Sequence, residues 1–299
     1  MHRRQTLTMK VRASLLVAAL VLLAGFPVDA LSKNFIWKAT SRTGGTVYLA
    51  GSVHLLSRDY YPLDPAFESA LQGADLLVEE IELGEMLAPR SQMLLVTRGM
   101  LPATQSLDKL ISSQTFAAVS SKVVELGLPV EAIKRLKPWS IALTLQALEW
   151  QKAGLDVNLG LDKHLYDIAK TSGKATDGLE TLEFQISRLD DMPTDLQDRL
   201  LAETLSELEH AREAFTKIAG AWKTGDVATV ERLVLQDLKT QPQLYERLLL
   251  ERNRNWLPKI EALFARPRPA FVVVGAAHLV GADGLLQMLR TKGYTLEQL

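Results

Sequence analysis

"YLAGSVHLL", residues Tyr48–Leu56, and "VVVGAAHLV", residues Val272–Val280, are the two stretches that decide the fold. Each is an apolar run typical of a buried strand, followed by a G-x-x-H spacing that ends in His54 or His278. The chain has only five histidines, so the repetition is unusual. Glycine lets a backbone leave a strand sharply, without a Cβ. We therefore expect both imidazoles at the carboxyl edge of one sheet, where open α/β folds bind ligands.

The residues around these two phrases predict strands and helices in alternation. Residues 34–56 contain two β-rich runs separated by "SRTGG", which predicts a hairpin. A short helix over 65–72 and a strand over 74–83 follow, which predicts a β-α-β unit with a parallel pair. The last forty residues predict a helix end, a buried strand, a loop, a helix, a glycine turn and a final strand.

The middle of the chain has a different pattern. Apolar residues recur there every three or four positions, which predicts helices. Two of these, "WSIALTLQALEWQKAG" and "LDKHLYDIAKTSGK", are closed by a glycine, and residues 174–180 are a short extended candidate. The predicted fold class is α/β, a mixed sheet with flanking helices and a large central helical insertion at about 105–265, all in one domain over 31–299.

Residues 1–30 have the layout of a secretory signal peptide. Cationic residues precede an apolar run, and Ala30 offers a cleavage point. The run is shorter than a membrane span requires, so we expect a periplasmic or secreted protein without a span after cleavage. An uncleaved anchor is the alternative.

Charge and cysteine content narrow the function classes. The formal charge is −1, and loss of the leader moves it to about −4, which argues against nucleic acid as a partner. The sequence has no cysteine, so disulfides and thiolate ligands are excluded. Histidines and carboxylates remain as the strong candidates for a protein-supplied metal site.

The two histidines of the G-x-x-H phrases are therefore candidate metal ligands. Two strands ending in this way can aim both imidazoles into one crevice, and neutral imidazole is a common ligand for divalent transition metals. The alternative is a pair of buried histidines bonded to the backbone. His164 and His210 lie on charge-rich helical stretches, where a solvated or helix-terminus role is expected.

Carboxylates close to the predicted strand ends are the candidate partners. "LLVEEIEL" places Glu80 at a strand end near His54, as a ligand or as the base for a metal-bound water. Glu79 lies on the opposite face by the period of two. Glu180 follows the short extended segment, and Asp162 falls in the first turn of a helix. Each of these has a plain alternative as a solvated or helix-capping side chain.

The quoted phrases, together with "YYPLDPAFESALQGADLLVEEIEL", "LGLDKHLYDIAKTSGKATDGLETLEFQ" and "LLLERNRNWLPKIEAL", resemble the TraB/PrgY/GumN family, in its GumN-like branch, which is related to the TIKI metalloproteases. The resemblance covers nearly the whole mature chain. It implies a fold shared with erythromycin-esterase-like and haem-binding ChaN-like proteins, and a metal-dependent, peptidase-like site.

The resemblance also implies site residues. The family pattern of two histidines, a glutamate and an arginine falls on His54, His278, Glu80 and Arg252. Asn253, Asp162 and Glu180 stand where the family keeps polar residues. Glu79 departs from the pattern, since an apolar residue is usual there, and this leaves open which glutamate points inward.

Three hypotheses about function follow. The first is a secreted metallohydrolase with His54, His278 and Glu80 on Mn, Co or Zn, Glu80 or Glu180 as proton shuttle, and Arg252 on the oxyanion. Asp162, Asn253 and Glu79 would surround these ligands. Its substrate would be a peptide, ester or glycan-linked small molecule in the cell envelope. The second is a non-catalytic protein that binds metal, haem or glycan, and the third is an accessory factor in polysaccharide export. The sequence leaves the oligomeric state open.

Overall fold

The computed structural model describes residues 33–208 and 210–299, so the predicted signal peptide lies outside the described residues. Its centre is a six-stranded sheet in the order β4-β3-β5-β2-β1-β6. The strands are β1 (Ile36–Thr40), β2 (Thr46–Ser52), β3 (Leu76–Glu79), β4 (Ala175–Gly178), β5 (Ala270–Gly275) and β6 (Thr295–Gln298). The mixed sheet confirms the predicted α/β class.

The strands β4, β3, β5 and β2 are parallel, whereas β1 pairs antiparallel with both β2 and β6. The predicted hairpin is β1–β2. The parallel relation of β2 and β3 is also present, but these strands are not neighbours, because β5 lies between them. All six residues of β5 are buried. A strand that is apolar on both faces belongs in the interior of a sheet, with a neighbour on each side.

Helices account for most of the rest of the chain. They are α1 (Pro65–Gly73), α2 (Leu83–Leu87), α3 (Pro89–Gly99), α4 (Ser113–Glu125), α5 (Val130–Ile133), α6 (Pro138–Lys152), α7 (Leu161–Thr171), α8 (Leu182–Asp190), α9 (Thr194–Leu208), α10 (Ala211–Lys223), α11 (Val227–Lys239), α12 (Pro242–Tyr245), α13 (Glu251–Leu263), α14 (Ala276–Leu279) and α15 (Leu285–Thr291). Three short 3-10 turns are η1 (Arg58–Tyr60), η2 (Leu107–Lys109) and η3 (Val157–Leu159), and η4 (Glu246–Leu250) is a π-helical turn.

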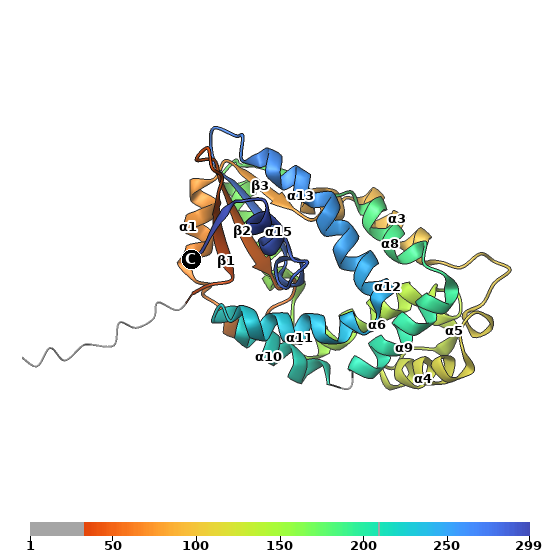
Figure 1. Ribbon diagram of the computed structural model, residues 1–299. Helices are drawn as coiled ribbons and strands as arrows, with labels where there is room; N and C mark the ends of the chain where they lie inside the picture. Colours follow the sequence, from red (N-terminus) through yellow and green to blue (C-terminus); the bar gives the residue numbers. More distant parts are fainter. Residues whose placement is uncertain (1–32, 209) are drawn as a thin grey trace, which may run out of the picture. The chain divides into compact units, whose positions relative to one another are not determined.

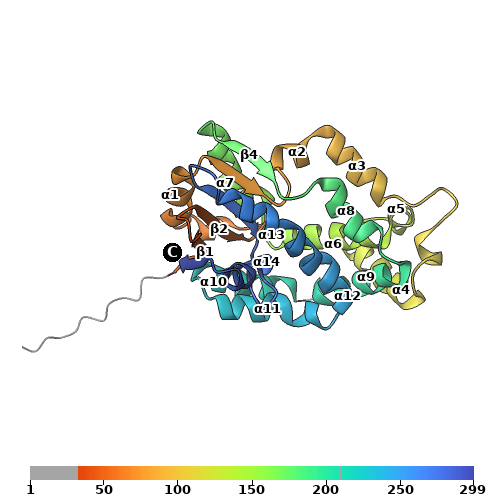
Figure 2. The same cartoon turned by 45° about the horizontal axis from the view of Figure 1, so that its top comes forward.

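Helices cover both faces of the sheet. Helices α1 and α7 pack on one side, and α13 and α15 pack on the other (Figures 1 and 2). One continuous apolar core joins these helices to the strands. The helical segment begins at α2, before the expected boundary near residue 105, and it is interrupted by β4, which returns to the edge of the sheet.

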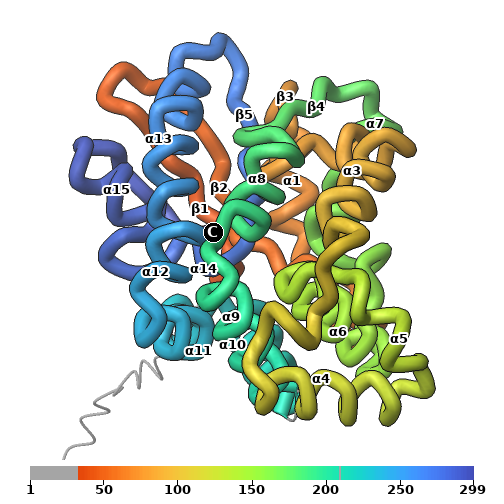
Figure 3. The backbone as a smooth tube through the Cα atoms, turned by 90° about the vertical axis from the view of Figure 1, so that its right-hand side faces the viewer, coloured from red at the N-terminus to blue at the C-terminus, as the bar shows by residue number. Residues whose placement is uncertain are grey.

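The middle helices have an apolar core of their own. Helix α9 packs along α6 and α4, and α3 lies beside α8 (Figure 3). Leu107, Val119, Val123 and Leu201 are fully buried in this second core. Helices α6 and α7 end before Gly154 and Gly173, whose φ angles of 86° and 66° suit glycine, as their sequences predicted. Among the described residues, no helix combines the length and apolarity needed to cross a membrane.

Gly51 is required by close packing at the end of β2. A Cβ at this position would lie 2.5 Å from Phe35 Cδ1 and 3.1 Å from Ala276 Cα. Trp222 of α10 donates its indole N–H to the Gly51 carbonyl at 2.6 Å. The first G-x-x-H glycine therefore fits β2 between Phe35 and the start of α14.

We predict that Gly51→Ala destabilises the protein by about 1–3 kcal/mol, because a buried ring and a backbone segment would have to move. The control is Gly220→Ala at an exposed position of α10, where a Cβ meets nothing within 4 Å. That change should stabilise by about 0.5–1 kcal/mol through helix propensity. Urea unfolding of both variants measures these changes in the free energy of unfolding. Equal stabilities for the two variants would contradict the packing argument.

Candidate functional site

The candidate site lies where the parallel strands end. His54 follows β2 by two residues, Glu80 follows β3 directly, and Glu180 follows β4 by two residues. Strand β5 ends at Gly275, and His278 lies three residues beyond. Because β5 stands between β3 and β2, Glu80 and His54 approach Gly275 from opposite sides. Residues more than 200 positions apart in sequence thus meet at one sheet edge.

Gly275 leaves open the point on which these side chains converge. A Cβ built on Gly275 would lie 3.3 Å from Glu80 Oε1, 3.4 Å from His54 Nε2 and 3.7 Å from His278 Cδ2. The φ and ψ angles of Gly275 are −50° and 137°, which other residues also adopt. The second G-x-x-H glycine therefore serves to keep space free, and the expected role in a sharp backbone exit does not apply.

Glu80 is held as a carboxylate at this point. Its Oε1 accepts the Gly275 N–H at 2.7 Å, and its Oε2 accepts from Arg252 Nη2 and from Gln185 Nε2. Burial alone would raise the pKa of Glu80, but the Arg252 guanidinium, the charged His54 imidazole and the Gly275 N–H hold it well below its usual range. Glu80 therefore enters the site as a negative charge with a fixed orientation.

Arg252 connects the site residues from α13. Its Nε and Nη2 contact Glu180, and Nη2 also contacts Glu80. Its Nη1 donates to the Leu248 carbonyl at 3.2 Å and to His278 Nε2 at 3.1 Å. These contacts match the five N–H groups of a guanidinium. Arg252 in this arrangement has no N–H left for an oxyanion.

The π-helical turn η4 directly precedes α13 and supplies one of these acceptors, the Leu248 carbonyl. A π turn displaces backbone carbonyls from the regular helical ladder, and such turns are frequent at functional sites. The turn therefore helps to fix the direction of the guanidinium.

Glu180 lies behind Arg252, away from solvent. Its side chain is 4% exposed, and Trp256 Nε1 donates to its Oε2 at 2.8 Å. Gln185 Nε2 lies 3.2 Å from its Oε1. Burial raises the pKa of Glu180, and the pairing with Arg252 opposes that rise. The contacts of Glu180 fit a residue that orients Arg252.

The His278 ring has a defined tautomer. The amide nitrogen of Asn253 donates to the carbonyls of His278 and Asp283, so its Oδ1 accepts from His278 Nδ1 at 2.7 Å. The unprotonated Nε2 then faces Arg252. Burial lowers the pKa of His278 to about 3, so the ring is neutral at ordinary pH. Trp256 packs against the ring with its centroid 4.4 Å away.

His54 differs from His278 in exposure and charge. Its Nδ1 lies 2.9 Å from Asp162 Oδ2, and its side chain is 54% exposed. Asp162 raises the pKa of His54 to about 9. Asp162 is brought there because α7 begins against the His54 backbone, where a Cβ on Gly160 would lie 2.1 Å from the His54 carbonyl oxygen. The Asp162 bond leaves His54 Nε2 facing the point beside Gly275.

Glu79 is separated from the other site residues. Its carboxyl group accepts the Leu83 N–H at 3.0 Å, and the residue is 3% exposed. Burial raises the pKa of Glu79 to about 8, with Asp162 and Glu82 adding to the rise. Glu80 is therefore the glutamate that faces His54 and His278, which the sequence left open.

His164 and His210, the remaining histidines of the described chain, lie outside the site. His164 Nε2 pairs with Glu68 at 3.0 Å between two helices, and His210 precedes the first turn of α10.

Comparison with known sequences places the chain in a family. The sequence model of the TraB/PrgY/gumN family matches residues 35–298. The chain belongs to the TraB/PrgY/gumN family. It is 31% identical over 243 residues to "Uncharacterized protein YbaP" of Escherichia coli (strain K12), covering 81% of this chain and 87% of the relative. The protein of that name in Shigella flexneri matches with the same figures. No solved structure matches significantly, so the expected likeness to ChaN-like and erythromycin-esterase-like folds stays a prediction.

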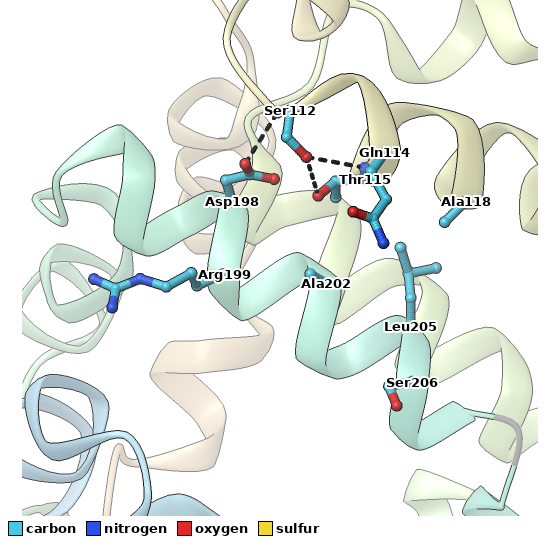
Figure 4. Close-up of a pocket in the computed structure, with 9 residues that line it drawn as sticks. All are labelled: Ser112, Gln114, Thr115, Ala118, Asp198, Arg199, Ala202, Leu205 and Ser206. Carbon is cyan, nitrogen blue, oxygen red and sulfur yellow. Dashed lines mark hydrogen bonds between the residues drawn. The ribbon is translucent and has the colours of Figure 1, made fainter.

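A hollow also lies away from the sheet edge, among the middle helices. A hollow of about 510 Å³ lies between α4 and α9 (Figure 4). Asp198 accepts the Ser112 N–H there, and the Ser112 hydroxyl bonds to Thr115 at the start of α4. These contacts cap a helix, and no imidazole lines the hollow.

Sequence reasoning missed three groups that complete the site. Gln185 bridges Glu80 and Glu180, Trp256 packs on both Arg252 and His278, and the Gly275 N–H binds Glu80. Trp256 lies four residues after Arg252, which places both side chains on one face of a helix. That spacing was a usable signal. Nothing in the sequence marked Gln185.

Glu79 gives a prediction about stability. The unfolded carboxyl ionises near pH 4.5, whereas the folded one stays protonated to about pH 8. The unfolded state is therefore favoured as pH rises from 4.5 to 8. Glu79→Gln removes this pH-dependent loss of stability and keeps an acceptor for the Leu83 N–H. We expect the variant to melt several degrees above wild type at pH 8.5 but nearly together with it at pH 4.5. A difference in melting temperature between Glu79→Gln and wild type that stays constant across this pH range would contradict a protonated Glu79.

Proposed function

We propose that this chain is an exported hydrolase that uses a divalent metal ion held among the side chains that converge beside Gly275. The single observation that carries the proposal is this convergence: His54 Nε2, Glu80 Oε1 and the His278 ring all lie within 4 Å of the position that a Cβ on residue 275 would take. The space is open only because residue 275 has no side chain. A partly exposed imidazole at its rim gives access from solvent.

The donor set fits a metal such as Mn, Co or Zn in its chemistry. His54 and Glu80 would hold the ion, and His278 Nε2, 3.9 Å from Glu80 Oε1, would be the third donor. Two donors about 2 Å from one ion are separated by no more than about 4 Å. As the side chains stand, no group of three such residues in the described chain forms a ready metal site. When bound, the ion would polarise a carbonyl and activate water.

The protein's own residues supply orientation and charge. Asp162 keeps a proton on His54 Nδ1, so Nε2 is the nitrogen whose lone pair becomes free when the imidazolium loses a proton. Arg252, Gln185 and the Gly275 N–H fix the Glu80 carboxylate, which either binds the ion or accepts a proton from the attacking water. Glu180 and Trp256 hold Arg252, and this matches a positioning role better than the proton shuttle expected from sequence.

Amide and ester bonds in peptides or glycan-linked small molecules are the proposed substrates, in the periplasm or outside the cell. The same crevice suits a rival function, the binding of metal, haem or an anionic glycan without turnover. A role as an accessory factor in polysaccharide export would not require the imidazoles.

Metal analysis and cleavage assays test the proposal. We expect one ion per chain and cleavage of a peptide library that is abolished by a chelator and restored by Mn, Co or Zn. Glu80→Gln should lower turnover by at least about 100-fold. The variant will retain the ion if Glu80 is the base and lose it if Glu80 is a ligand. The matched control is Glu183→Gln, an exposed position on α8.

Two outcomes would decide against hydrolysis. Stoichiometric metal without any chelator-sensitive cleavage would favour the binding function. Absence of bound metal in a folded protein that retains both histidines would remove the proposed centre.

The charge state of His54 predicts how metal binding depends on pH. With a pKa of about 9, His54 is protonated at neutral pH and must lose this proton to bind an ion. We expect about one proton released per ion at pH 7, and an affinity that rises by about tenfold per pH unit up to pH 9. Titration calorimetry in buffers of different ionisation enthalpy measures the release.

Asp162→Asn should return the His54 pKa toward 6.5 and remove most of the proton release at pH 7.5. Asp167→Asn, also on α7 but 55% exposed and paired with Lys163, is the control and should leave the release unchanged. Unchanged release in Asp162→Asn would show that His54 does not bind the ion.

A further inference from the structure

The contact between Arg252 and His278 occupies the lone pair that a metal would need. An arginine is always a donor, so the 3.1 Å contact with His278 Nε2 requires that nitrogen to be the acceptor. The Asn253 bond at Nδ1 leads to the same tautomer. The His278 ring is therefore neutral, and its Nε2 carries the lone pair that coordination requires. That lone pair, however, points at the Arg252 guanidinium.

The Arg252 guanidinium lies between two of the proposed ligands, where it takes the place of the metal cation. Arg252 bridges His278 Nε2 and Glu80 Oε2, with one N–H group on each. Its side chain is 9% exposed, and that of His278 is 7% exposed, so water does not compete strongly for either contact. His54 Nε2 has no such competitor among the described residues.

We propose that Arg252 and the metal ion compete for His278 Nε2, so that the site exists in two arrangements, one closed by Arg252 and one closed by the ion. The inference rests on the proposed metal centre and concerns how that centre is completed. His54 and Glu80 would hold the ion first, and His278 would join only when its ring turns from Nη1 of Arg252 toward the ion.

The remaining contacts of Arg252 allow this exchange. If the His278 contact is lost, Nε and Nη2 still pair with Glu80 and Glu180, and Nη1 still donates to Leu248. The guanidinium therefore stays in place while one N–H group becomes free beside the ion. That freed group is the donor that an oxyanion would need, so metal binding and the completion of the hydrolytic site become one event.

The test compares metal affinities of full-length mature protein, with Mn²⁺, Co²⁺ and Zn²⁺ as probes in titration calorimetry. Arg252→Lys keeps a positive charge near Glu80 and Glu180 but cannot make the same set of contacts. We expect it to bind the ion about tenfold more tightly, the effect of losing one charge-assisted hydrogen bond. Arg247→Lys is the control, since Arg247 bonds only to carbonyls of α8.

A second measurement does not depend on the stability of a variant. The ¹⁵N chemical shift of His278 Nε2 in wild-type protein should report a nitrogen that accepts a hydrogen bond, and diamagnetic Zn²⁺ should move it to a coordinated value. In Arg252→Lys without metal, the Nε2 signal should already have lost its acceptor character.

The outcomes separate the two proposals. Tighter binding in Arg252→Lys, or binding by this variant alone, supports the competition. Stoichiometric binding by wild type with unchanged affinity in Arg252→Lys overturns the competition but leaves the metal centre. Failure of both proteins to bind any of the three ions overturns the metal centre and the competition with it.

Discussion

The placement of β5 in the middle of the sheet is the constraint on which the site depends. Its six residues are buried, so the strand needs hydrogen-bonded neighbours on both edges and helices on both faces. These neighbours are β2 and β3, which end beside Gly275. His54 and Glu80 are carried to the same point from either side, and the hydrogen bond between Glu80 and the Gly275 N–H then ties β3 to β5 beyond their last paired residues.

A second constraint on the site is electrostatic. Two carboxylates share one buried guanidinium, and the Trp256 ring lies over that guanidinium with 4.6 Å between ring centroid and Cζ. Buried charges are costly unless each is paired and hydrogen-bonded, and here almost every lone pair and N–H has a partner. Such a network stabilises one geometry of Glu80 and His278. The exposed pair of His54 and Asp162 lies at its rim, where solvent and a ligand can reach it.

Much of the architecture was readable from local patterns. The hairpin, helix α1, the glycine-closed helices α6 and α7 and the C-terminal strand–helix–strand order all follow from periodicity and turn residues. The insertion of β5 between β2 and β3 was not readable, since it depends on long-range pairing. The same limit applies to contacts within the site. Gln185 and the Leu248 carbonyl act through positions set by tertiary packing, and the saturation of the five Arg252 N–H groups appears only when its four partner residues are known. The space that Gly275 leaves free likewise cannot be read from the sequence.

The late position of β5 in the chain also has a consequence for folding. A nascent polypeptide that has left the ribosome only as far as α13 already carries His54, Glu80, Glu180 and Arg252, yet the two halves of its parallel sheet have no strand to join them. Contacts between residues so far apart in sequence form slowly, because the chain loses loop-closure entropy before these contacts contribute any stability. The site is therefore complete only when β5 has paired with both β2 and β3.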